Sequence, residues 1–504
     1  MKILFNPTSY RRGAVWAVGA TAVWKVLSFL NALLIAAYFG AGKATDLYFY
    51  LILAMGLGVY FLQRMNAAVI IPEAMTRDAQ TPGQARPLLN FFLYFYVALL
   101  ILLTVAAWFF PVTLGRIFSR FPQADLTAQR SLLTLGFILF GLQLLASYLQ
   151  SVLEMYHRFT SALFTPLNAL LPLVCLVMLG GKCGIASMFY GFIASYLLQS
   201  IVFAGWIKYG LNWEFRWQGF YAGKQFLHNL GSNQLMELAN LVSSVLPLYL
   251  LSGLSAGLVS ALNYAKQLSD STNEVLTLRV VNLSKIQITE DMAASRWDAC
   301  NRHYLMTHYV LWFLLSPLVV FSFYYAQDII TLFFARGAFT QRDALEAAAF
   351  LRPLLLILLI LPSVLMQNNM AAAGRKVKEF LPYGLFSTGL FIVLVPLAIW
   401  LWGAFAFPYM QLVCYLAGLA VSAVFLHKYF PAFVLKESYR QALHVVSINL
   451  IALVPAGVCG ALTAGLHVWW RIGSAGILFV GFLMLITWKS GDLKMFYTFL
   501  RQQN

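Results

Sequence analysis

Charge is scarce in this sequence, and acidic charge is scarcest. Only 10% of the 504 residues are charged, with 18 Asp and Glu against 34 Lys and Arg, whereas 61% are hydrophobic. A soluble domain keeps charged side chains on its surface, so this composition excludes a soluble protein and favours one that crosses a membrane. The mean hydropathy of +0.76 agrees with that interpretation.

The common catalytic and metal-binding motifs are also missing. The five cysteines are odd in number and have no paired spacing, so they predict neither a disulfide framework nor a CxxC metal site. The sequence contains no GxxxxGK[ST] loop, no HExxH motif and no serine nucleophile elbow. We therefore expect no metal, no cofactor and no bound ATP, and we expect a protein that is not an enzyme.

Long apolar runs fill the chain instead. Fourteen runs long enough to cross a bilayer, which takes about 20 residues, are separated by short polar breaks. A transmembrane barrel would show short alternating segments. The sequence therefore predicts an all-α polytopic membrane protein with about 14 transmembrane helices. Because the loops are short, we expect no soluble domain.

The basic residues predict how the chain is oriented. With fourteen spans, the termini and loops of one side hold 21 Lys and Arg, the other side holds eight, and five lie within spans, which accounts for all 34. Cytoplasmic loops carry the excess of basic residues, so both termini are predicted to be cytoplasmic. Contact with anionic lipid explains the net charge of +16. The sequence contains no soluble stretch in which basic and aromatic residues alternate, so it does not suggest binding to nucleic acid.

The second half of the sequence repeats features of the first half at a nearly constant offset. With the two halves in that register, Arg120 falls over Arg336, Arg158 over Arg375, and Tyr48 over Tyr264. Six spans separate the copies, so the halves share one orientation and are predicted to be related by a pseudo-twofold axis along the membrane normal. We expect two six-helix lobes, residues 1–226 and 227–432, followed by two extra helices in 433–504. Transporters of this plan bind substrate between the lobes.

One lysine stands in the middle of the first span. Placing a charge at membrane depth costs roughly 2.5–3.5 kcal/mol on insertion scales. Lys25 is about 12 residues from either end of its helix, too far for its stem of about 6 Å to reach the interface. Thr21, Ser28 and Asn31 lie on the same helical face. We expect Lys25 and Asn31 to face a polar cavity or a ligand.

Three later spans carry further polar side chains. Arg64 in the second span either faces the cavity or snorkels to the cytoplasmic interface. In the eighth span, an ion pair between Lys266 and Asp270 within one helix is the alternative to a cavity lining. Carboxylates at this depth could also bind a coupling H⁺ or Na⁺. The polar stripes of the seventh and eighth spans are Asn233, Glu237 and Asn240, and Lys266, Asp270 and Glu274.

Two stretches resemble a known family. LLIAAYFGAGKATDLYF at 33–49 closely resembles the first periplasmic junction of the MviN/MurJ family of lipid II flippases, and residues 330–375 resemble its ninth and tenth spans. Fourteen spans in two lobes plus two helices are also that family's plan. The family belongs to an exporter superfamily that includes polysaccharide flippases and multidrug antiporters.

The resemblance implies a function and a site. It implies a flippase that moves an undecaprenyl-pyrophosphate-linked saccharide from the inner to the outer leaflet of the bacterial inner membrane by alternating access. Asp46 is retained from the family pattern, whereas Lys25 and Asn31 stand where the family has two arginines. The lipid-linked saccharide that the resemblance implies is either lipid II or a lipid-linked repeat unit of a surface polysaccharide. The predicted substrate-binding residues are Lys25, Asn31, Asp46, Arg64, Asn233, Glu237, Asn240 and Lys266, with Asp270 and Glu274 as coupling-ion candidates.

Three alternatives stay open. A multidrug or cation antiporter of the same superfamily would carry cations, which a positively charged cavity disfavours. A membrane glycosyltransferase, polymerase or ligase usually needs a sizeable soluble loop with acidic residues, which this chain lacks. A scaffold for cell-envelope glycan synthesis proteins is the third alternative. The energy source is H⁺, Na⁺ or the membrane potential.

Overall fold

Helices and connecting turns make up the part of the chain that the structure describes. The computed structural model describes residues 10–217, 219–220 and 222–494, and within this part there is no β-strand. By packing, the chain divides into two compact units, residues 1–260 and 261–504. The predicted all-α multi-pass membrane class is confirmed.

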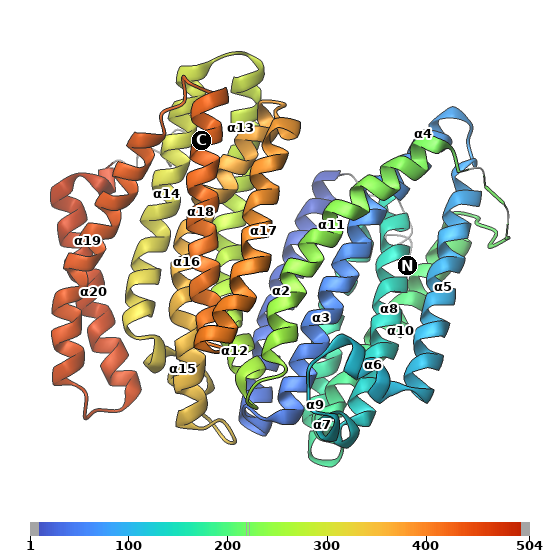
Figure 1. Cartoon of the computed structure of the whole chain (residues 1–504), viewed down its shortest axis with the longest axis horizontal. Coiled ribbons are helices and arrows are strands. Elements are labelled where there is room, and N and C mark those ends of the chain that lie inside the picture. The colour runs from blue at the N-terminus through green and yellow to red at the C-terminus, as the bar shows by residue number, and fades with distance from the viewer. Residues whose placement is uncertain (1–9, 218, 221, 495–504) are drawn as a thin grey trace. The chain divides into compact units, whose positions relative to one another are not determined.

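The first unit runs from α2 to α11 (Figure 1). Two short elements depart from α-helical geometry: η1 (Asn66–Ile70) is a π-helical turn and η2 (Phe159–Phe164) is a 3₁₀ helix. The α-helices are α2 (Tyr10–Phe39), α3 (Lys43–Met65), α4 (Ile71–Gln80), α5 (Ala85–Phe109), α6 (Pro111–Phe118), α7 (Gln123–Ala128), α8 (Arg130–Met155), α9 (Leu167–Cys183), α10 (Ala186–Gly210) and α11 (Lys224–Leu251).

The second unit takes up most of α12 (Leu258–Thr272) and all later elements. A second π-helical turn, η3 (Asn273–Thr277), joins α12 to α13. The remaining helices are α13 (Leu278–Ala293), α14 (Trp297–Tyr324), α15 (Ala326–Phe334), α16 (Gln341–Ala373), α17 (Val377–Trp402), α18 (Ala406–Tyr429), α19 (Leu435–Leu462) and α20 (Val468–Ser490).

Twelve helical stretches of the described chain are long and apolar enough to cross a membrane. The two other long helical paths are α11 and the continuous run α12–η3–α13. Both carry the polar side chains that the sequence analysis assigned to the seventh and eighth spans, and only 237–251 of α11 is apolar. The predicted count of fourteen is reached when these two polar paths are included.

The order of elements repeats along the chain. The series from α2 to α10 recurs from α11 to α18, with a π turn in the second path and a short helix, α6 or α15, after the third. Left-handed backbone positions recur in the pairs Gly40 and Gly257, His157 and Arg375, and Gly184 and Gly403. The two members of each pair are separated by nearly the same offset as the residues that the sequence repeat aligns.

The predicted lobe boundaries follow this repeat rather than the packing. The repeat assigns α11 to the second lobe, 227–432, whereas by contact α11 packs against α3 and η1 and belongs to the first unit. The division into 1–226, 227–432 and 433–504 stays a prediction.

Buried tyrosines in the interior of the first unit pack against one another, and their hydroxyl groups form hydrogen bonds. The rings of Tyr96 on α5 and Tyr148 on α8 stack with centroids 4.9 Å apart. Tyr96 donates a hydrogen bond of 2.9 Å to the Asn66 side chain at the start of η1, and Tyr148 donates to the Leu89 carbonyl. Burying a hydroxyl is tolerated when it finds a partner.

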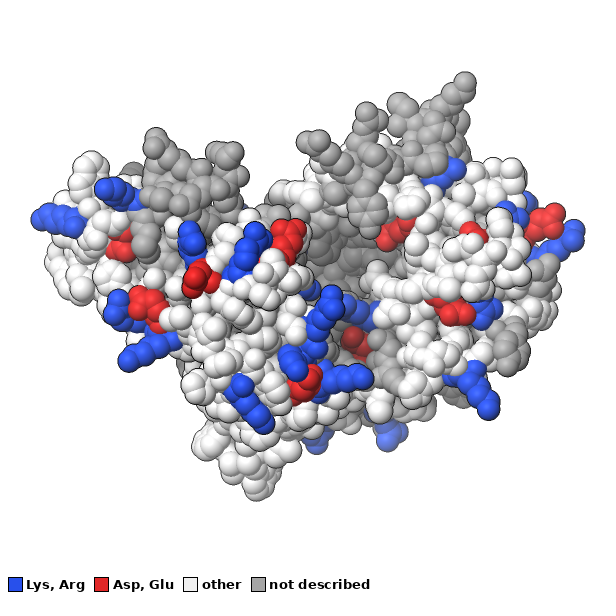
Figure 2. Space-filling view, turned by 90° about the horizontal axis from the view of Figure 1, so that it is seen from above, with Lys and Arg blue, Asp and Glu red and all other residues white. Residues whose placement is uncertain are grey.

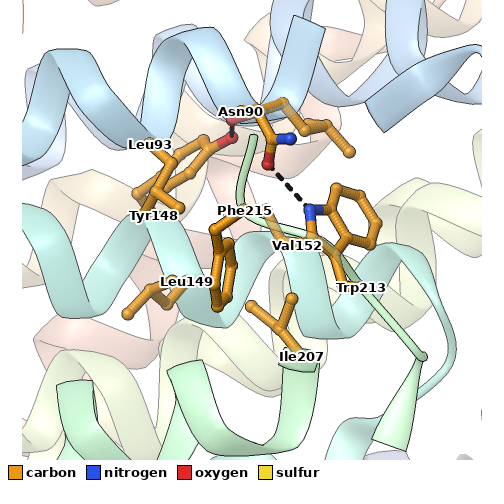
Figure 3. A pocket seen from close by; sticks show the side chains of 9 residues that line it. Asn90, Leu93, Tyr148, Leu149, Val152, Ile207, Trp213 and Phe215 are labelled. Carbon is orange, nitrogen blue, oxygen red and sulfur yellow. Dashed lines mark hydrogen bonds between the residues drawn. The ribbon is translucent and has the colours of Figure 1, made fainter. Parts of the chain in front are cut away.

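The segment between α10 and α11 is fastened to α5. The Trp213 indole donates to the Asn90 side-chain oxygen Oδ1 at 2.7 Å, and the Asn90 side-chain amide donates to the backbone carbonyls of Glu214 and Arg216. Figure 3 shows this hydrogen bond beside a small pocket whose other walls are mostly apolar, formed by Leu149, Val152 and their neighbours. None of the predicted site residues lines this pocket.

In the second unit, the hairpin of α19 and α20 is fastened to its neighbours. Tyr309 on α14 donates to the Asp492 carboxylate at 2.8 Å, just beyond the end of α20. Tyr325, which directly follows α14, donates to the Ala456 carbonyl in α19 at 2.7 Å. These bonds lie at different levels of the hairpin and fix it within the second unit.

Figure 2 views the end of the molecule at which α4 is joined to α5. Lys and Arg side chains outnumber Asp and Glu side chains on this face. The predicted orientation, with this end and both termini in the cytoplasm, fits that charge distribution and stays a prediction.

Candidate functional site

Lys25 lies within α2 and is half-buried. Its ammonium nitrogen lies 5.1 Å from the centre of the neighbouring Trp24 ring. A cation over an indole face is stabilised electrostatically. The Trp24 ring is therefore a favourable neighbour for the Lys25 side chain within the first span.

Asn31, two turns further along α2, is buried and connects two helices. Its side-chain amide donates a 2.8 Å hydrogen bond to the Ala169 carbonyl in α9, and only 6% of the residue is exposed. Its side-chain oxygen has no hydrogen-bond partner among the described residues. The side-chain amide of Asn31 therefore donates its hydrogen bond to the protein backbone of α9.

Asp46 occupies the first turn of α3 and is almost fully buried. One carboxylate oxygen accepts from the Gly257 backbone N–H at 2.6 Å, and the other accepts from the backbone N–H and the hydroxyl of Ser260, at 2.7 and 2.6 Å. These donors belong to the start of α12, where a helix has unsatisfied N–H groups and a partial positive charge. Asp46 thus caps a helix distant in sequence.

Arg64 lies one residue before the end of α3 and is exposed. Its Nε donates to the Tyr60 hydroxyl at 2.6 Å, and the guanidinium lies 4.8 Å from the Tyr60 ring centre. Arg64 is 21 residues from the start of α3, or about 32 Å along the helix, close to the roughly 30 Å of a hydrocarbon core. Both predicted interpretations, cavity and interface, stay open.

On α11, two of the three predicted residues are in contact. The Asn240 amide lies 3.4 Å from a Glu237 carboxylate oxygen as a hydrogen-bond donor. Glu237 is half-buried and Asn240 is exposed. The side chain of Asn233 lies outside the described part of the structure.

On α12 and η3, the three predicted residues differ in exposure. Asp270 is exposed, whereas Lys266 and Glu274 are half-buried. The salt bridge between Lys266 and Asp270 that the sequence allowed does not occur among the described ion pairs. The carboxylate of Asp270 is thus presented at the surface of its unit.

The polar residues of α2, α11 and α12 lie at similar depths along their helices. Lys25 and Glu237 are each 14 residues from the end of their helix, about 21 Å, and Asp270 is 12 residues from the start of α12, about 18 Å. If those helix ends mark one interface, such positions lie about 9–12 Å from the other side of a hydrocarbon core of about 30 Å. Charged groups there face protein or water.

Sequence reasoning missed the helix-capping role of Asp46 and the polar interior of the second unit. His308 and Tyr304, both 0% exposed, had not been assigned a role. The seven histidines show no motif, so only the fold could bring His308 to attention. Among the described residues, no group of His, Cys, Asp and Glu could hold a metal ion.

A family model described as "Lipid II flippase MurJ" matches residues 35–484, most of the chain. The chain belongs to the MurJ family of lipid II flippases. A search of the curated proteins returned no match.

Solved structures show the same fold. A lipid II flippase MurJ in an inward closed conformation superposes with a TM-score of 0.79 at 17% identity, covering 95% of this chain and 99% of that one. An inward-facing multidrug MATE transporter gives 0.62 at 14% identity, with 82% and 98% covered. A transporter of the same MOP superfamily from Pyrococcus furiosus gives 0.54 at 12% identity, with 86% and 94% covered. The predicted resemblance is confirmed, and these relatives are transporters rather than enzymes.

Proposed function

We propose that this chain is a flippase that moves an undecaprenyl-pyrophosphate-linked saccharide from the inner to the outer leaflet by alternating access. Membership of the MurJ family supports the class of substrate. The observation that carries the proposal is Lys25, a half-buried cation about 21 Å from the end of α2. A pyrophosphate is the part of such a lipid that a cation binds.

The role of Lys25 follows from electrostatics. An ammonium group attracts a phosphate far more strongly in a low-dielectric surrounding than in water. In this proposal Glu237 and Asn240 hydrogen-bond sugar hydroxyls, since carboxylates and amides are the usual partners of hydroxyl groups. Arg64 and Lys266 are weaker candidates for the phosphates. Asn31 and Asp46 act indirectly, because their side chains hold α9 and the start of α12.

A flipping assay with purified protein in vesicles tests the proposal. With lipid II and with a polysaccharide-type pyrophosphate lipid as separate substrates, K25A is expected to reduce the flipping rate at least tenfold, about 1.4 kcal/mol of lost stabilisation. K25R keeps the charge and is expected to keep most activity. The matched control is Lys43→Ala, which removes an exposed lysine paired with Asp125.

Full flipping activity of K25A on both lipids would contradict the proposed role of Lys25. Preference for one of the two lipids by the unaltered protein identifies the saccharide class. If neither lipid is moved but cationic drugs are exported, the antiporter alternative replaces the flippase.

The coupling and the cellular setting are further parts of the proposal. Membrane potential, H⁺ or Na⁺ drives the cycle, with Asp270 and Glu274 as the predicted ion-binding carboxylates. The chain resides in the bacterial inner membrane with both termini in the cytoplasm, alongside proteins of envelope glycan synthesis. Labelling of single cysteines placed in the 81–84 turn and at 464–466 by an impermeant reagent tests this orientation, because only the second site should react from outside.

A further inference from the structure

Three aspartates of the described chain are buried, and two of them have a clear source of positive charge. Asp46 accepts from the N–H groups at the start of α12, and Asp291 forms an ion pair with Arg296. Buried charges in proteins are paired or coordinate a metal, because removing an ion from water is costly. The third aspartate, Asp492, therefore needs a partner as well.

Asp492 lies two residues beyond the end of α20 and is 6% exposed. One carboxylate oxygen accepts from the Tyr309 hydroxyl at 2.8 Å, and the other accepts from the Ser490 hydroxyl and lies 3.3 Å from His444 Nε2. Among the ion pairs of the described residues, none joins Asp492 to a lysine or an arginine. Hydroxyls and a neutral imidazole donate hydrogen bonds without adding charge, so they leave the negative charge of Asp492 unbalanced.

The end of α20 strengthens the negative potential at this place. The last carbonyl groups of a helix lack intrahelical donors and carry a partial negative charge, which attracts cations. Gly491 follows α20 in the left-handed conformation and donates its N–H to the Trp488 carbonyl, so the chain turns directly from the helix end into Asp492. The position is thus the electrostatic opposite of the Asp46 site, where a carboxylate faces the start of a helix.

Asp492 also lines a small cavity between α14, α19 and α20. The helix α19 packs against both α14 and α20. Phe313 and Pro317 of α14, Asn449 of α19 and Thr487 of α20 are among the other residues of the cavity wall. The cavity has room for about one sphere the size of a water molecule, which suits a small ion and excludes an organic ligand.

The wall of this cavity offers uncharged oxygen atoms from all three helices. The Asn449 side-chain amide donates to a carbonyl of its own helix, while its side-chain oxygen is buried and has no hydrogen-bond partner among the described residues. Pro317 has no N–H, so the carbonyl of Phe313, four residues earlier in α14, lacks its usual helical donor. The Thr487 hydroxyl donates within α20 and keeps its lone pairs.

We propose that Asp492, the side-chain oxygen of Asn449 and the backbone carbonyl of Phe313 bind one monovalent cation of the size of Na⁺ in this cavity. In membrane transporters, carbonyls of interrupted helices and the C-terminal ends of helices coordinate Na⁺. The set holds one acidic group, so one positive charge neutralises it, whereas a divalent cation would leave a buried excess charge. The ion links the segment after α20 to α14 and α19.

Binding of radioactive sodium to the purified full-length protein in detergent tests the site. The protein should bind Na⁺ saturably, and N449L, which removes the amide oxygen at nearly constant size, should weaken binding at least tenfold. D492N should abolish the binding. The control N229L changes an exposed asparagine of α11 that pairs with Gln225, and it should leave the affinity unchanged.

The binding assay also has to exclude a second ion. Asp270 and Glu274 are the coupling-ion candidates of the proposed flippase, so all variants are compared in a D270N/E274Q background. In that background, the absence of saturable Na⁺ binding would overturn the site. Equal affinities with and without the N449L change would do the same.

Hydrogen exchange measures the effect of the ion on the fold. At a Na⁺ concentration about ten times the Kd, the opening that releases the ion should be about tenfold rarer than in N-methylglucamine at the same ionic strength. Residues 483–492 should therefore exchange about tenfold faster without Na⁺, whereas residues 88–96 of α5 should not change. N449L in Na⁺ should behave as the unaltered protein does without Na⁺. Identical exchange of 483–492 in both salts would contradict the proposal.

A protonated Asp492 is the competing explanation for the unbalanced charge, and D492N separates the two. With a bound cation, D492N should exchange residues 483–492 rapidly in both salts. If the native carboxylate is protonated, D492N should exchange as slowly as the unaltered protein in both salts, and the cation site is wrong. Neither experiment contains a lipid substrate, so the site can be confirmed even if the proposed flippase function fails.

Discussion

The second helical path of each repeat contains a π turn that begins with asparagine, and the two turns differ in their hydrogen bonding. In α3–η1–α4, the Asn66 side chain accepts from Tyr96. In α12–η3–α13, the Asn273 side-chain oxygen is buried and has no partner among the described residues. π turns often mark functional or mobile positions in helices. Both paths therefore contain the π turn, but among the described residues only the first asparagine oxygen has a hydrogen-bond donor.

The starts of the two paths differ as well. The first path carries Asp46 in its opening turn, and the repeat places Leu262 at the equivalent position of the second. The carboxylate of the first path caps the second path through Gly257 and Ser260. The first copy thus acts as a scaffold on which the start of the more polar second copy is held.

Of the substitutions that test this comparison, replacing Asp46 should lower the free energy of unfolding the most. D46A leaves two backbone N–H groups and the Ser260 hydroxyl buried without a partner, and it should lower the free energy of unfolding by about 3–5 kcal/mol. Equilibrium denaturation of the detergent-solubilised protein measures it. The control D125N breaks an exposed pair with Lys43 and should cost less than about 1 kcal/mol. Equal effects of both variants would contradict the capping role.

The next largest effect on stability is expected at two glycines, one in the α9–α10 hairpin and one in the α17–α18 hairpin that corresponds to it in the repeat. A Cβ on Gly191 in α10 would lie 2.4 Å from the Pro172 backbone of α9, whereas a Cβ on Gly418 in α18 would meet only the movable Ser387 hydroxyl of α17, at 2.8 Å. G191A should therefore destabilise by about 3 kcal/mol and G418A by about 1 kcal/mol. Parallel thermal unfolding of the two variants checks the order, and a reversal would mean that α9 and α10 can separate easily.

Removing the Tyr96 hydroxyl tests the closed π turn directly. Y96F leaves the Asn66 oxygen buried without its donor and should cost about 2 kcal/mol. Hydrogen exchange of residues 66–70 should also increase, because the turn loses its restraint. Unchanged exchange there would show that the ring packing of Tyr96 on Tyr148, and not the hydrogen bond, holds η1.

The smallest effect is expected at Thr277, in the other π turn. T277V keeps the shape of the side chain and removes a buried hydroxyl that has no protein partner in the described structure. If water serves this hydroxyl, the change should cost about 0.5–1 kcal/mol. A gain in stability would instead indicate that the hydroxyl is unsatisfied and the second π turn is dry.

Sequence patterns were sufficient for the membrane class, the repeat and the family, because each depends on properties summed over many residues. Long apolar runs identify spans, and a single alignment of the two halves matched elements that the fold pairs. The site was harder to predict from sequence. Lys25 was proposed as a site residue because a charge within an apolar helix is conspicuous, and that role stays a prediction. Nothing in the sequence indicated that the Asp46 carboxylate is engaged by the start of α12.

By itself, the sequence determined that this chain crosses a membrane many times, that it is built from two related halves, and that a cation stands within its first span. Hydrophobicity and periodicity are local properties, so no folded chain is needed to read them. Only the tertiary structure decided which polar groups are satisfied. Asn66 and Asn273 begin equivalent turns, yet the Tyr96 hydroxyl serves the first and no described group serves the second. Hydrogen bonding depends on distances of a few ångströms between helices, which packing alone sets.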